Sequence, residues 1–473
     1  MIPLTLGEIA DLVDGAVAGP DPVAASETVV TGPPSVDSRD IDSGGLFVAV
    51  LGEHVDGHDY AEAAVEAGAA GVLAARPVEV PCVVTADPVV ALGRLAQAVL
   101  SRLPGCTVIG VTGSQGKTSA KDMLAQILER VGPTVAPRGS FNNEIGAPLT
   151  ALRCDPDTQF LVVEMGARGG GHIRDLAAMA GPTVGLVLNV GVAHLGEFGT
   201  RVDIAAAKGE LVEALPADGR AVLNIDDDLV RGMAGRTDAP VRWFGTAGAA
   251  DVRLGEVELD AHGRPRFTLT TSDGSADLTL QLVGEHQAHN AAAVAATALA
   301  AGVPWPVVVE ALGQVESRSR WRMEVHERAD GVTVVNDAYN ANPDSMRAAL
   351  KTLAVLGAGH RRTVAVLGEM LELGAASQDE HDAVGRLVVR LNVSRLVVVG
   401  EGARPMHLGA ELEGSWDGES VFVPDADAAV EFLRDDVGAG DVVLVKASRA
   451  TGLERVAEAL LAGTTDDEEE VRG

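Results

Sequence analysis

The chain has 473 residues, of which 47% are hydrophobic, 22% charged and 3% aromatic, and its formal net charge at pH 7 is −31. At about 150 residues per domain, this length predicts roughly three domains. The large negative charge argues against a nucleic-acid backbone or an anionic membrane as a partner, because both are anionic themselves.

The first residues and the cysteines indicate in which cell compartment the protein works and whether its cysteines are functional. Residues 1–12 include Glu8 and Asp11 and no basic residue, so they do not resemble a signal peptide. No run of about 18 apolar residues offers a transmembrane helix, and we expect a cytoplasmic protein. The cysteines follow no C-x-x-C spacing, and we interpret them as small core residues rather than redox or metal sites. They are Cys82, Cys106 and Cys154.

Residues 1–104 predict a first α/β domain with short elements. We expect helices at 6–13, 61–70 and 89–102, and strands at 44–50, 71–74 and 82–85. Two polar loops, 35–39 and 53–58, interrupt the pattern. Arginine in the first loop suits bidentate contact with a phosphate or a uracil edge. Taken alone, an ordinary turn explains each loop better. A Leu-Pro-Gly linker at 103–105 ends this domain.

A glycine-rich loop opens the central domain, 105–314. The apolar run 106–111 predicts a buried strand, and apolar residues from Ala120 to Leu128 recur at helical spacing. Between them, residues 110–119 are G-V-T-G-S-Q-G-K-T-S. Glycines let backbone N–H groups turn toward an anion, and the helix N-terminus adds positive potential. Lys117 is placed to reach phosphates and Thr118 to bind Mg²⁺. The common motif G-x-x-x-x-G-K-[ST] needs glycine at 111, where this chain has Val111.

Two further polar residues follow strand ends in this domain. We expect strands at 160–164, 184–190 and 221–225, and Glu164 and His194 come at or just after the ends of the first two. In a parallel sheet such ends share one rim, where ligands bind. Each residue alone has an ordinary structural explanation. Beside a nucleotide loop, we expect Glu164 to supply an oxygen and His194 a nitrogen to a metal.

Lys208 is expected on a helix at 203–215, on an apolar face. Its neighbours at helical spacing include no acid; they are Ile204, Ala205, Leu211 and Val212. Burial lowers the pKa of a lysine. A neutral amine can react with CO₂ to form a carbamate, which is an anionic oxygen ligand.

Residues 315–463 predict a second doubly wound domain, Rossmann-like but without G-x-G-x-x-G. We expect strands at 332–336, 363–367, 395–400, 420–423 and 441–445, and helices near 343–356, 378–391, 425–434 and 451–461. The acidic segment 464–473 is expected to be a disordered tail. The predicted fold class is therefore α/β with three domains: an N-terminal substrate domain, a central nucleotide-binding parallel sheet and a C-terminal Rossmann-like domain.

Read together, the motifs resemble the Mur ligase family over nearly the whole chain. In chain order they are T-G-S-Q-G-K-T-S, F-N-N-E-I-G-A-P-L-T, V-V-E-M-G-A-R, N-V-G-V-A-H-L, A-K-G-E-L, H-N-A-A-A, N-D-A-Y-N-A-N-P-D-S-M, V-L-G-E-M-L-E-L-G and K-A-S-R. The stretches 337–343 and 367–374 are similar to those of members that join D-alanyl-D-alanine to UDP-N-acetylmuramoyl-tripeptide. Members that add the third amino acid usually carry D-N-P-R, and the nearest stretch here, 402–405, is G-A-R-P.

The resemblance implies an ATP- and Mg²⁺-dependent amide ligase of peptidoglycan precursor synthesis, working through an acyl phosphate. It implies first-metal ligands Thr118 and Glu164, second-metal ligands His194 and carbamylated Lys208, and catalytic roles for Lys117, Glu164, His194 and Lys208. The implied nucleotide-binding residues are Thr112, Gly113, Ser114, Gln115, Gly116, Lys117, Thr118, Ser119, Asn290, Arg322 and Asp337. Those implied for the muramoyl substrate are Ser38, Arg39, Asn142 and Asn143, and for the dipeptide Asn340 and Asn342, with Asp337 beside them.

Two other functions fit parts of the same pattern. A non-catalytic ATP-dependent switch needs no second substrate site, and the presence of Glu164, His194, Lys208 and the Ser38–Arg39 loop argues against it. A folylpolyglutamate synthase typically begins at the ATP domain, so the first 104 residues argue against that function. Nothing in the sequence demands more than a monomer.

Overall fold

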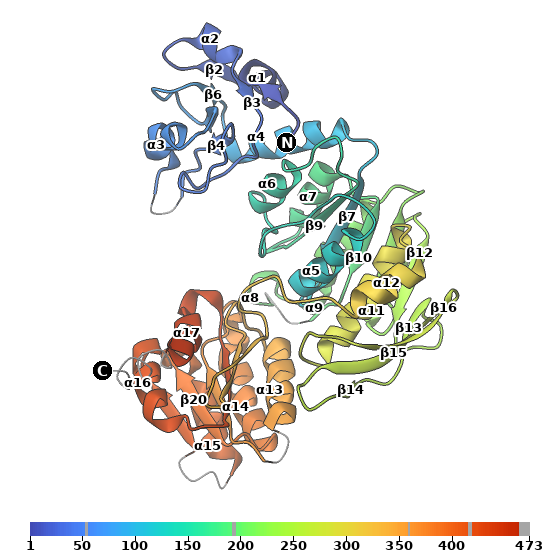
Figure 1. Ribbon diagram of the computed structural model, residues 1–473, viewed down its shortest axis with the longest axis vertical. Helices are drawn as coiled ribbons and strands as arrows, with labels where there is room; N and C mark the ends of the chain where they lie inside the picture. The colour runs from blue at the N-terminus through green and yellow to red at the C-terminus, as the bar shows by residue number, and fades with distance from the viewer. Residues whose placement is uncertain (53–54, 192–194, 358–359, 415–418, 463–473) are drawn as a thin grey trace.

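A computed structural model describes residues 1–52, 55–191, 195–357, 360–414 and 419–462. Figure 1 shows three α/β bodies that follow one another in chain order, with the second between the first and the third. Among the described segments, no helix is both long enough and apolar enough to cross a membrane. The predicted acidic tail, 464–473, and the predicted ligand His194 lie outside the described residues.

The first body is a small sheet flanked by helices. Its elements are β1 (Leu4–Thr5), α1 (Leu6–Val13), β2 (Ala16–Ala18), α2 (Pro22–Ser26), β3 (Val29–Val30), β4 (Leu46–Val48), η1 (Gly57–Tyr60), α3 (Ala61–Glu66), β5 (Gly71–Ala74), β6 (Cys82–Val84) and α4 (Pro88–Ser101). The sheet order is β2-β6-β5-β4, with β2 antiparallel to β6 and the rest parallel. β1 and β3 form a separate antiparallel ribbon.

Local chemistry explains where the helices of this body begin and end. α1 starts in a capping box, because Glu8 N donates to Thr5 Oγ1 (3.1 Å) and Thr5 N donates to Glu8 Oε2 (2.8 Å). The helix predicted at 61–70 stops at Glu66, because the chain turns at Gly68, whose φ is +119°. The strand predicted at 44–50 is also shorter and spans only Leu46–Val48.

The first and second bodies share one hydrophobic core. Leu92, Leu95 and Val99 of α4 belong to the same buried cluster as Leu6 of α1 and Val163 of the central sheet. The long helix α4 therefore fixes the first body to the second by apolar burial rather than by a flexible connection.

The central body is a ten-stranded sheet covered on both faces. Its elements are β7 (Thr107–Thr112), α5 (Lys117–Leu128), β8 (Thr134–Val135), α6 (Gly146–Ala151), β9 (Phe160–Glu164), α7 (His172–Ala180), β10 (Val184–Val187), α8 (Leu195–Phe198), α9 (Arg201–Glu213), β11 (Arg220–Asn224), α10 (Asp228–Arg231), η2 (Gly232–Arg236), β12 (Val241–Gly245), β13 (Val252–Leu254), β14 (Glu258–Leu259), β15 (Pro265–Thr271), β16 (Gly274–Thr279), α11 (His286–Ala300) and α12 (Trp305–Leu312). The order is β14-β15-β13-β12-β11-β10-β7-β9-β8, with β16 paired to β15.

Parallel pairing runs from β8 to β13, and the strand before the glycine loop lies inside that run. β7 pairs in parallel with β10 on one side and β9 on the other. The antiparallel pairs all involve β15, which pairs with β13, β14 and β16. The carboxyl ends of β7, β9 and β10 consequently face the same rim, as the sequence predicted.

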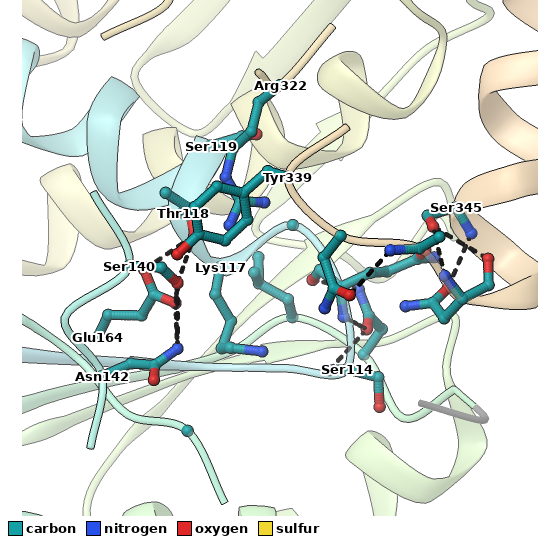
Figure 2. A pocket seen from close by; sticks show the side chains of 18 of the residues that line it. Ser114, Lys117, Thr118, Ser119, Ser140, Asn142, Glu164, Arg322, Tyr339 and Ser345 are labelled. Atoms are coloured by element: carbon teal, nitrogen blue, oxygen red, sulfur yellow. Dashed lines mark hydrogen bonds between the residues drawn. The ribbon is translucent and has the colours of Figure 1, made fainter. Parts of the chain in front are cut away.

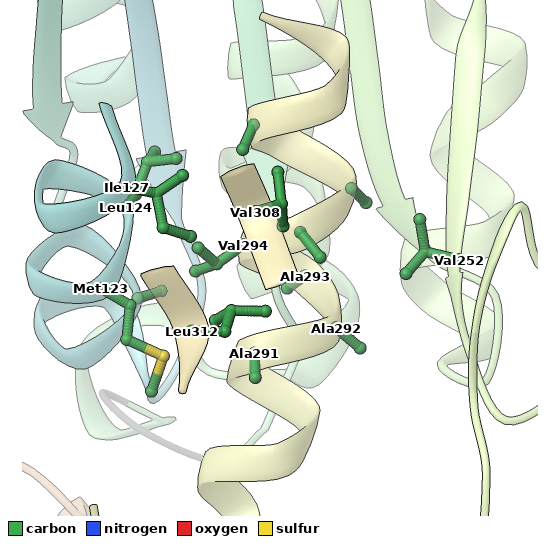
Figure 3. Close-up of a cluster of buried hydrophobic side chains, with 14 of the residues drawn as sticks. Met123, Leu124, Ile127, Val252, Ala291, Ala292, Ala293, Val294, Val308 and Leu312 are labelled. Carbon is green, nitrogen blue, oxygen red and sulfur yellow. The ribbon is translucent and has the colours of Figure 1, made fainter. Parts of the chain in front are cut away.

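An alanine-rich helix lies across one face of this sheet. In Figure 3, Ala291 and Val294 of α11 lie among Met123 and Ile127 of α5 and Leu312 of α12. Because alanine side chains are short, α11 can pack closely against the sheet.

The third body is doubly wound. Its elements are β17 (Glu324–Glu327), β18 (Thr333–Asn336), α13 (Pro343–Gly357), β19 (Thr363–Leu367), η3 (Gly374–Ala376), α14 (Ser377–Arg390), β20 (Arg395–Val399), η4 (Glu401–Ala403), α15 (Arg404–Glu413), β21 (Ser420–Val423), α16 (Ala426–Asp436), β22 (Val442–Lys446), η5 (Arg449–Thr451) and α17 (Glu454–Ala462). The sheet order is β17-β18-β22-β19-β20-β21, parallel except for the edge strand β17.

Helices cover both faces of this third sheet. α13, α14 and α15 form one core with it, and α16 and α17 form another on the opposite face. The predicted fold class, α/β with a Rossmann-like third domain, is confirmed. The predicted domain boundaries fall between α4 and β7 and between α12 and β17, and they stay predictions.

The connection between the second and third bodies is attached to α5. Gln126 of α5 bonds both backbone groups of Glu316, with Nε2 donating to O (2.9 Å) and Glu316 N donating to Oε1 (3.0 Å). Arg318 forms a two-pronged ion pair with Glu129 at 2.6 Å. Directly after these anchors, Trp321 and Met323 have left-handed φ values of 60° and 51°, a conformation unusual for non-glycine residues.

Candidate functional site

The glycine loop joins a strand end to a helix N-terminus, as the sequence predicted. It runs from β7 to Lys117, the first residue of α5. Gly116 has φ +80°, and a Cβ there would lie 2.5 Å from Oδ1 of Asn290. Only glycine therefore fits this position, on backbone and on space. Lys117 Nζ donates to the carbonyl of Gly113 (2.8 Å), and burial is the main reason that the pKa of Lys117 is lowered.

Asn189, which the sequence analysis did not single out, braces the same loop. Its Oδ1 accepts from Ser114 N (3.1 Å) and Gln115 N (3.0 Å), and its Nδ2 donates to Gln115 O (3.2 Å). Gly191 N donates to Ser114 Oγ at 2.9 Å. The signal was available, because Asn189 opens the N-V-G-V-A-H-L stretch directly after a strand. The loop is thus pre-shaped by a neighbouring strand end.

Glu164 is a fully buried carboxylate with three neutral donors. Its Oε2 accepts from Thr118 Oγ1 (3.0 Å), and its Oε1 accepts from Ser140 Oγ (3.0 Å) and Asn142 Nδ2 (2.9 Å). Figure 2 shows this group beside Lys117. Hydrogen bonds of this kind are what keep a buried carboxylate from being prohibitively costly. Ser140 was not predicted; it directly precedes the predicted F-N-N-E stretch.

Lys208 is buried on α9 with 4% of its surface exposed. Burial first, and the charge of Lys117 second, hold the pKa of Lys208 well below its ordinary value. Within the described parts of the chain, Lys208 has no ion-pair partner. Both causes act in the direction that the carbamate hypothesis requires, because they disfavour the ammonium form of Lys208.

The described residues include no cluster of three or more His, Cys, Asp or Glu side chains placed to hold a metal. They do bring together hard oxygen donors at Thr118 and Glu164. Mg²⁺ prefers oxygen ligands, and it usually takes one or two protein carboxylates and completes its shell with phosphate and water. The donor set at Thr118 and Glu164 therefore fits Mg²⁺.

The amino end of α11 forms the next part of the wall. Asn290 is buried, and its Nδ2 donates to Oε1 of Gln287 at 3.0 Å. His286, one turn earlier, has a buried Nδ1 with no hydrogen-bond partner among the described residues. Burial lowers the pKa of His286 to about 4, so its ring is neutral at pH 7. Gln287 and His286 were not predicted.

The third body supplies the opposite wall. Asp337 accepts from Lys446 Nζ (2.6 Å) and from Met323 N (3.1 Å), and Lys446 Nζ also donates to Asn340 O (2.9 Å). The guanidinium carbon of Arg322 lies 4.2 Å from the ring centre of Tyr339. This ion pair and stack fix the side chains predicted to contact the nucleotide.

Asn342 is held by the first turn of α13. Its Oδ1 accepts from Ser345 N at 2.9 Å, and Asn342 N donates to Ser345 Oγ at 3.0 Å. The predicted dipeptide contact by Asn342 therefore competes with a local hydrogen bond. Among the described residues, the side chain of Asn340 bonds only the neighbouring Ala341 N (2.9 Å).

One cavity of about 1060 Å³ lies between the second and third bodies. Fourteen of the predicted site residues line it: Ser114, Gln115, Gly116, Lys117, Thr118, Ser119, Asn142, Asn143, Glu164, Asn290, Arg322, Asp337, Asn340 and Asn342. Thr112, Gly113 and Lys208 are not part of its lining. Ser38 and Arg39 lie apart on the first body, where Arg39 pairs with Asp37 at 2.8 Å and is 87% exposed.

Sequence families match all three bodies. The Mur ligase family, catalytic domain, matches residues 35–103; the Mur ligase middle domain matches 111–298; and the Mur ligase, glutamate ligase domain, matches 321–449. A Mycobacterium tuberculosis protein named UDP-N-acetylmuramoyl-tripeptide--D-alanyl-D-alanine ligase is 49% identical, covering 98% of this chain and 99% of that protein.

Solved structures agree with these matches. UDP-N-acetylmuramoylalanyl-D-glutamyl-2,6-diaminopimelate--D-alanyl-D-alanyl ligase from Acinetobacter baumannii aligns with a TM-score of 0.83 at 30% identity, covering 97% of this chain and 98% of that chain. MurF ligase from Thermotoga maritima in complex with ADP aligns with a TM-score of 0.77 at 30% identity, covering 94% and 99%.

Proposed function

This chain belongs to the Mur ligase family, and we propose that it joins D-alanyl-D-alanine to UDP-N-acetylmuramoyl-tripeptide in peptidoglycan precursor synthesis, converting ATP to ADP and phosphate. The observation that carries the proposal is the buried Thr118–Glu164 pair beside Lys117, at the rim of a cavity closed by the third body. Relatives of nearly equal length that bear this ligase name support the choice of substrates.

The proposed reaction has two steps. A carboxylate oxygen of the tripeptide attacks the γ-phosphorus of ATP, and ADP leaves with the electrons of the broken P–O bond. The amine of D-alanyl-D-alanine then attacks the resulting acyl phosphate, and the tetrahedral adduct collapses to an amide and free phosphate. A carboxylate is a poor electrophile, and phosphorylation gives it a leaving group.

The residues of the central body supply charge neutralisation and position. Lys117 is the first residue of α5 and lines the cavity, so its ammonium can leave Gly113 O and pair with phosphate oxygens. Thr118 and Glu164 would hold Mg²⁺ through their oxygens. When bound, Mg²⁺ neutralises phosphate charge as the phosphoryl group is transferred.

Lys208 fits the proposed second metal site because its lowered pKa favours the neutral amine that carbamate formation requires. A carbamate on Nζ would turn this buried nitrogen into an anionic oxygen ligand, whose charge is opposite to that of the Lys117 ammonium. His194, which lies outside the described residues, is the other proposed ligand of that site.

Substrate contacts are proposed on three walls. Thr112 to Ser119 and Asn290 would hold ATP from the central body, and Arg322 and Asp337 from the third. Ser38, Arg39, Asn142 and Asn143 would contact the UDP-sugar-peptide, and Asn340, with Asn342 in second place, the dipeptide. The N-terminal sheet, matched as a Mur ligase domain, gives the folate alternative no support.

The direct test is ATP-dependent phosphate release from the purified protein with UDP-N-acetylmuramoyl-tripeptide, with D-alanyl-D-alanine present or omitted. We expect release only when both are present, with one phosphate for each amide formed. Release with a single amino acid and a shorter muramoyl peptide would move the protein to another step. ATP binding without release on any muramoyl acceptor would favour a switch over a ligase.

A further inference from the structure

Most basic side chains that line the cavity already have a partner. Lys446 pairs with Asp337, Arg322 stacks on Tyr339, and Arg449 both pairs with Glu454 (2.6 Å) and stacks on Trp321 (4.0 Å). Arg168 is different. It lines the same cavity, but within the described segments its guanidinium makes no hydrogen bond, ion pair or ring contact.

The backbone that carries Arg168 is held on both sides. Before it, Met165 N donates to Val111 O (2.8 Å) and Gly166 N donates to Asn142 O (2.8 Å). After it, the start of α7 is anchored by one buried carboxylate: Glu210 accepts from Gly171 N (2.6 Å) and Arg174 N (3.0 Å). A guanidinium projected from a fixed loop loses little backbone entropy when it binds a ligand.

Its position relative to the reacting groups is also defined. Arg168 follows Glu164 by four residues at the same strand end, and its loop is bonded to the segment that contains Asn142. It therefore lies on the central-body wall of the cavity, beside the residues proposed for the muramoyl peptide and across from the third body.

The acceptor peptide needs a cation there. In the name of the Acinetobacter baumannii ligase the peptide is alanyl-D-glutamyl-2,6-diaminopimelate. Such a peptide keeps free carboxylates besides the one that is activated. A chain with net charge −31 must offset them with a local positive group.

We propose that Arg168 binds a free carboxylate of the acceptor peptide, one that is not phosphorylated, and thereby contributes to the affinity of the enzyme for that peptide. The inference rests on the proposed function and assigns a residue that recognises the peptide part of the muramoyl substrate. A planar guanidinium matches a carboxylate in a two-pronged hydrogen bond, which lysine cannot reproduce.

Two carboxylates share this chemistry, and kinetics can tell them apart. One belongs to the D-glutamyl residue and is present in every such tripeptide. The other is the distal carboxylate of diaminopimelate, which a tripeptide ending in lysine lacks. A comparison of the two tripeptides separates these sources without any change in the enzyme.

The test uses Arg168→Gln and Arg168→Lys in the full-length protein with both tripeptides. We expect Arg168→Gln to raise KM for the peptide about tenfold, the scale of a lost charge-assisted hydrogen bond at a partly exposed site. The kcat should stay within about twofold, because the lost contact is made equally in the ground state and the transition state. Arg168→Lys should lie between wild type and Arg168→Gln.

The control is Arg253→Gln. Arg253 is exposed on β13, does not line the cavity and has no ion-pair partner within the described residues. Its replacement by glutamine changes the net charge as Arg168→Gln does, but away from the cavity. Its KM values should equal those of wild type. The KM for ATP and the thermal midpoint should be unchanged in every variant, which separates a lost contact from a distorted loop.

Each outcome decides something. A higher KM for both tripeptides assigns the D-glutamyl carboxylate, and a higher KM for the diaminopimelate peptide alone assigns the distal one. Unchanged KM values with both peptides, a fall in kcat alone, or a parallel rise in the KM for ATP would overturn the proposal. Wild-type protein inactive with both peptides would instead overturn the proposed function.

Discussion

Two buried ionisable side chains of the central body, Glu164 and Lys208, differ in the partners that they have. Three neutral donors reach the oxygens of buried Glu164, whereas buried Lys208 forms no ion pair within the described residues. The pKa of Lys208 is therefore lowered, because desolvation without a partner disfavours the ammonium form.

Lys208→Ala tests the consequence of that neutral amine. We expect turnover to fall by about two orders of magnitude or more, as for loss of one electrostatic contact to a transition state. Short carboxylic acids should restore part of the activity, because they can replace a carbamate in the space left by the side chain. The measurement is phosphate release with and without added acetate or propionate.

A direct observation complements the kinetics. Wild-type protein equilibrated with ¹³C-labelled bicarbonate should show a carbamate carbon signal that Lys208→Ala lacks. The carbamate should be lost as pH falls, because the amine protonates once the pH drops below its lowered pKa. Full activity in Lys208→Ala, or identical carbon spectra, would contradict the carbamate.

Elements show where the sequence predicts well and where it does not. The helix at 6–13 and the strands at 363–367 and 420–423 lie where periodicity placed them. α15 was missed, because Arg404-Pro405 opens it and small or charged residues blur its apolar period. Its position is set by contact with α14, where glycines allow the two backbones to approach, and such a contact is invisible in a local window of sequence.

The same contact gives an element-scale prediction. A Cβ on Gly385 of α14 would overlap the carbonyl oxygen of Met406 in α15. Gly385→Ala should therefore lower the free energy of unfolding by about 3 kcal/mol, the upper range for overpacking. The measurement is denaturant unfolding followed by circular dichroism.

Gly93 of α4 is the matched control. No heavy atom lies within 4 Å of a Cβ placed there. Gly93→Ala should raise stability by about 0.5–1 kcal/mol through the lower backbone entropy of alanine in the unfolded chain. Equal effects of the two substitutions would mean that α14 and α15 move apart easily.

The sequence predicted the parts of the site that depend on local motifs and missed those that depend on contacts between distant residues. The sequence predicted the glycine loop, Lys117 and Glu164, because each lies at or just after the end of a strand that the sequence pattern reveals. Ser140 and Asn189 were missed because each acts by bracing another residue across 24 or more positions. The pairing of Asp337 with Lys446, 109 positions apart, likewise depends on the register of β18 with β22.

For the whole molecule, the arrangement of cores indicates which body can move. The first and second bodies share a core through α4, while the third has cores of its own to which the central body adds Val283. The connection is anchored to α5 up to Arg318, and the left-handed residues Trp321 and Met323 follow at once. A change of angle is therefore expected at 319–323.

Distances between probes test this expectation. Cysteines introduced at exposed Val23, Val202 and Leu408, one on each body, carry spin labels. On adding ATP and the tripeptide, the Val202–Leu408 distance should change and the Val23–Val202 distance should not. A change in the second distance alone would place the motion at the first boundary. The parent protein, treated with the same spin label, shows whether the native cysteines react.

The common core of the first two bodies also bears on how such a chain can be taken apart. Separating the chain near residue 104 would remove the central-body part of the core around α4 and expose Val163 and its neighbours to water. A cut within 313–323 would sever few buried contacts. The first two bodies should therefore fold as one unit and the third as another. Fragments divided within 313–323 should fold when expressed separately, and fragments divided near residue 104 should not.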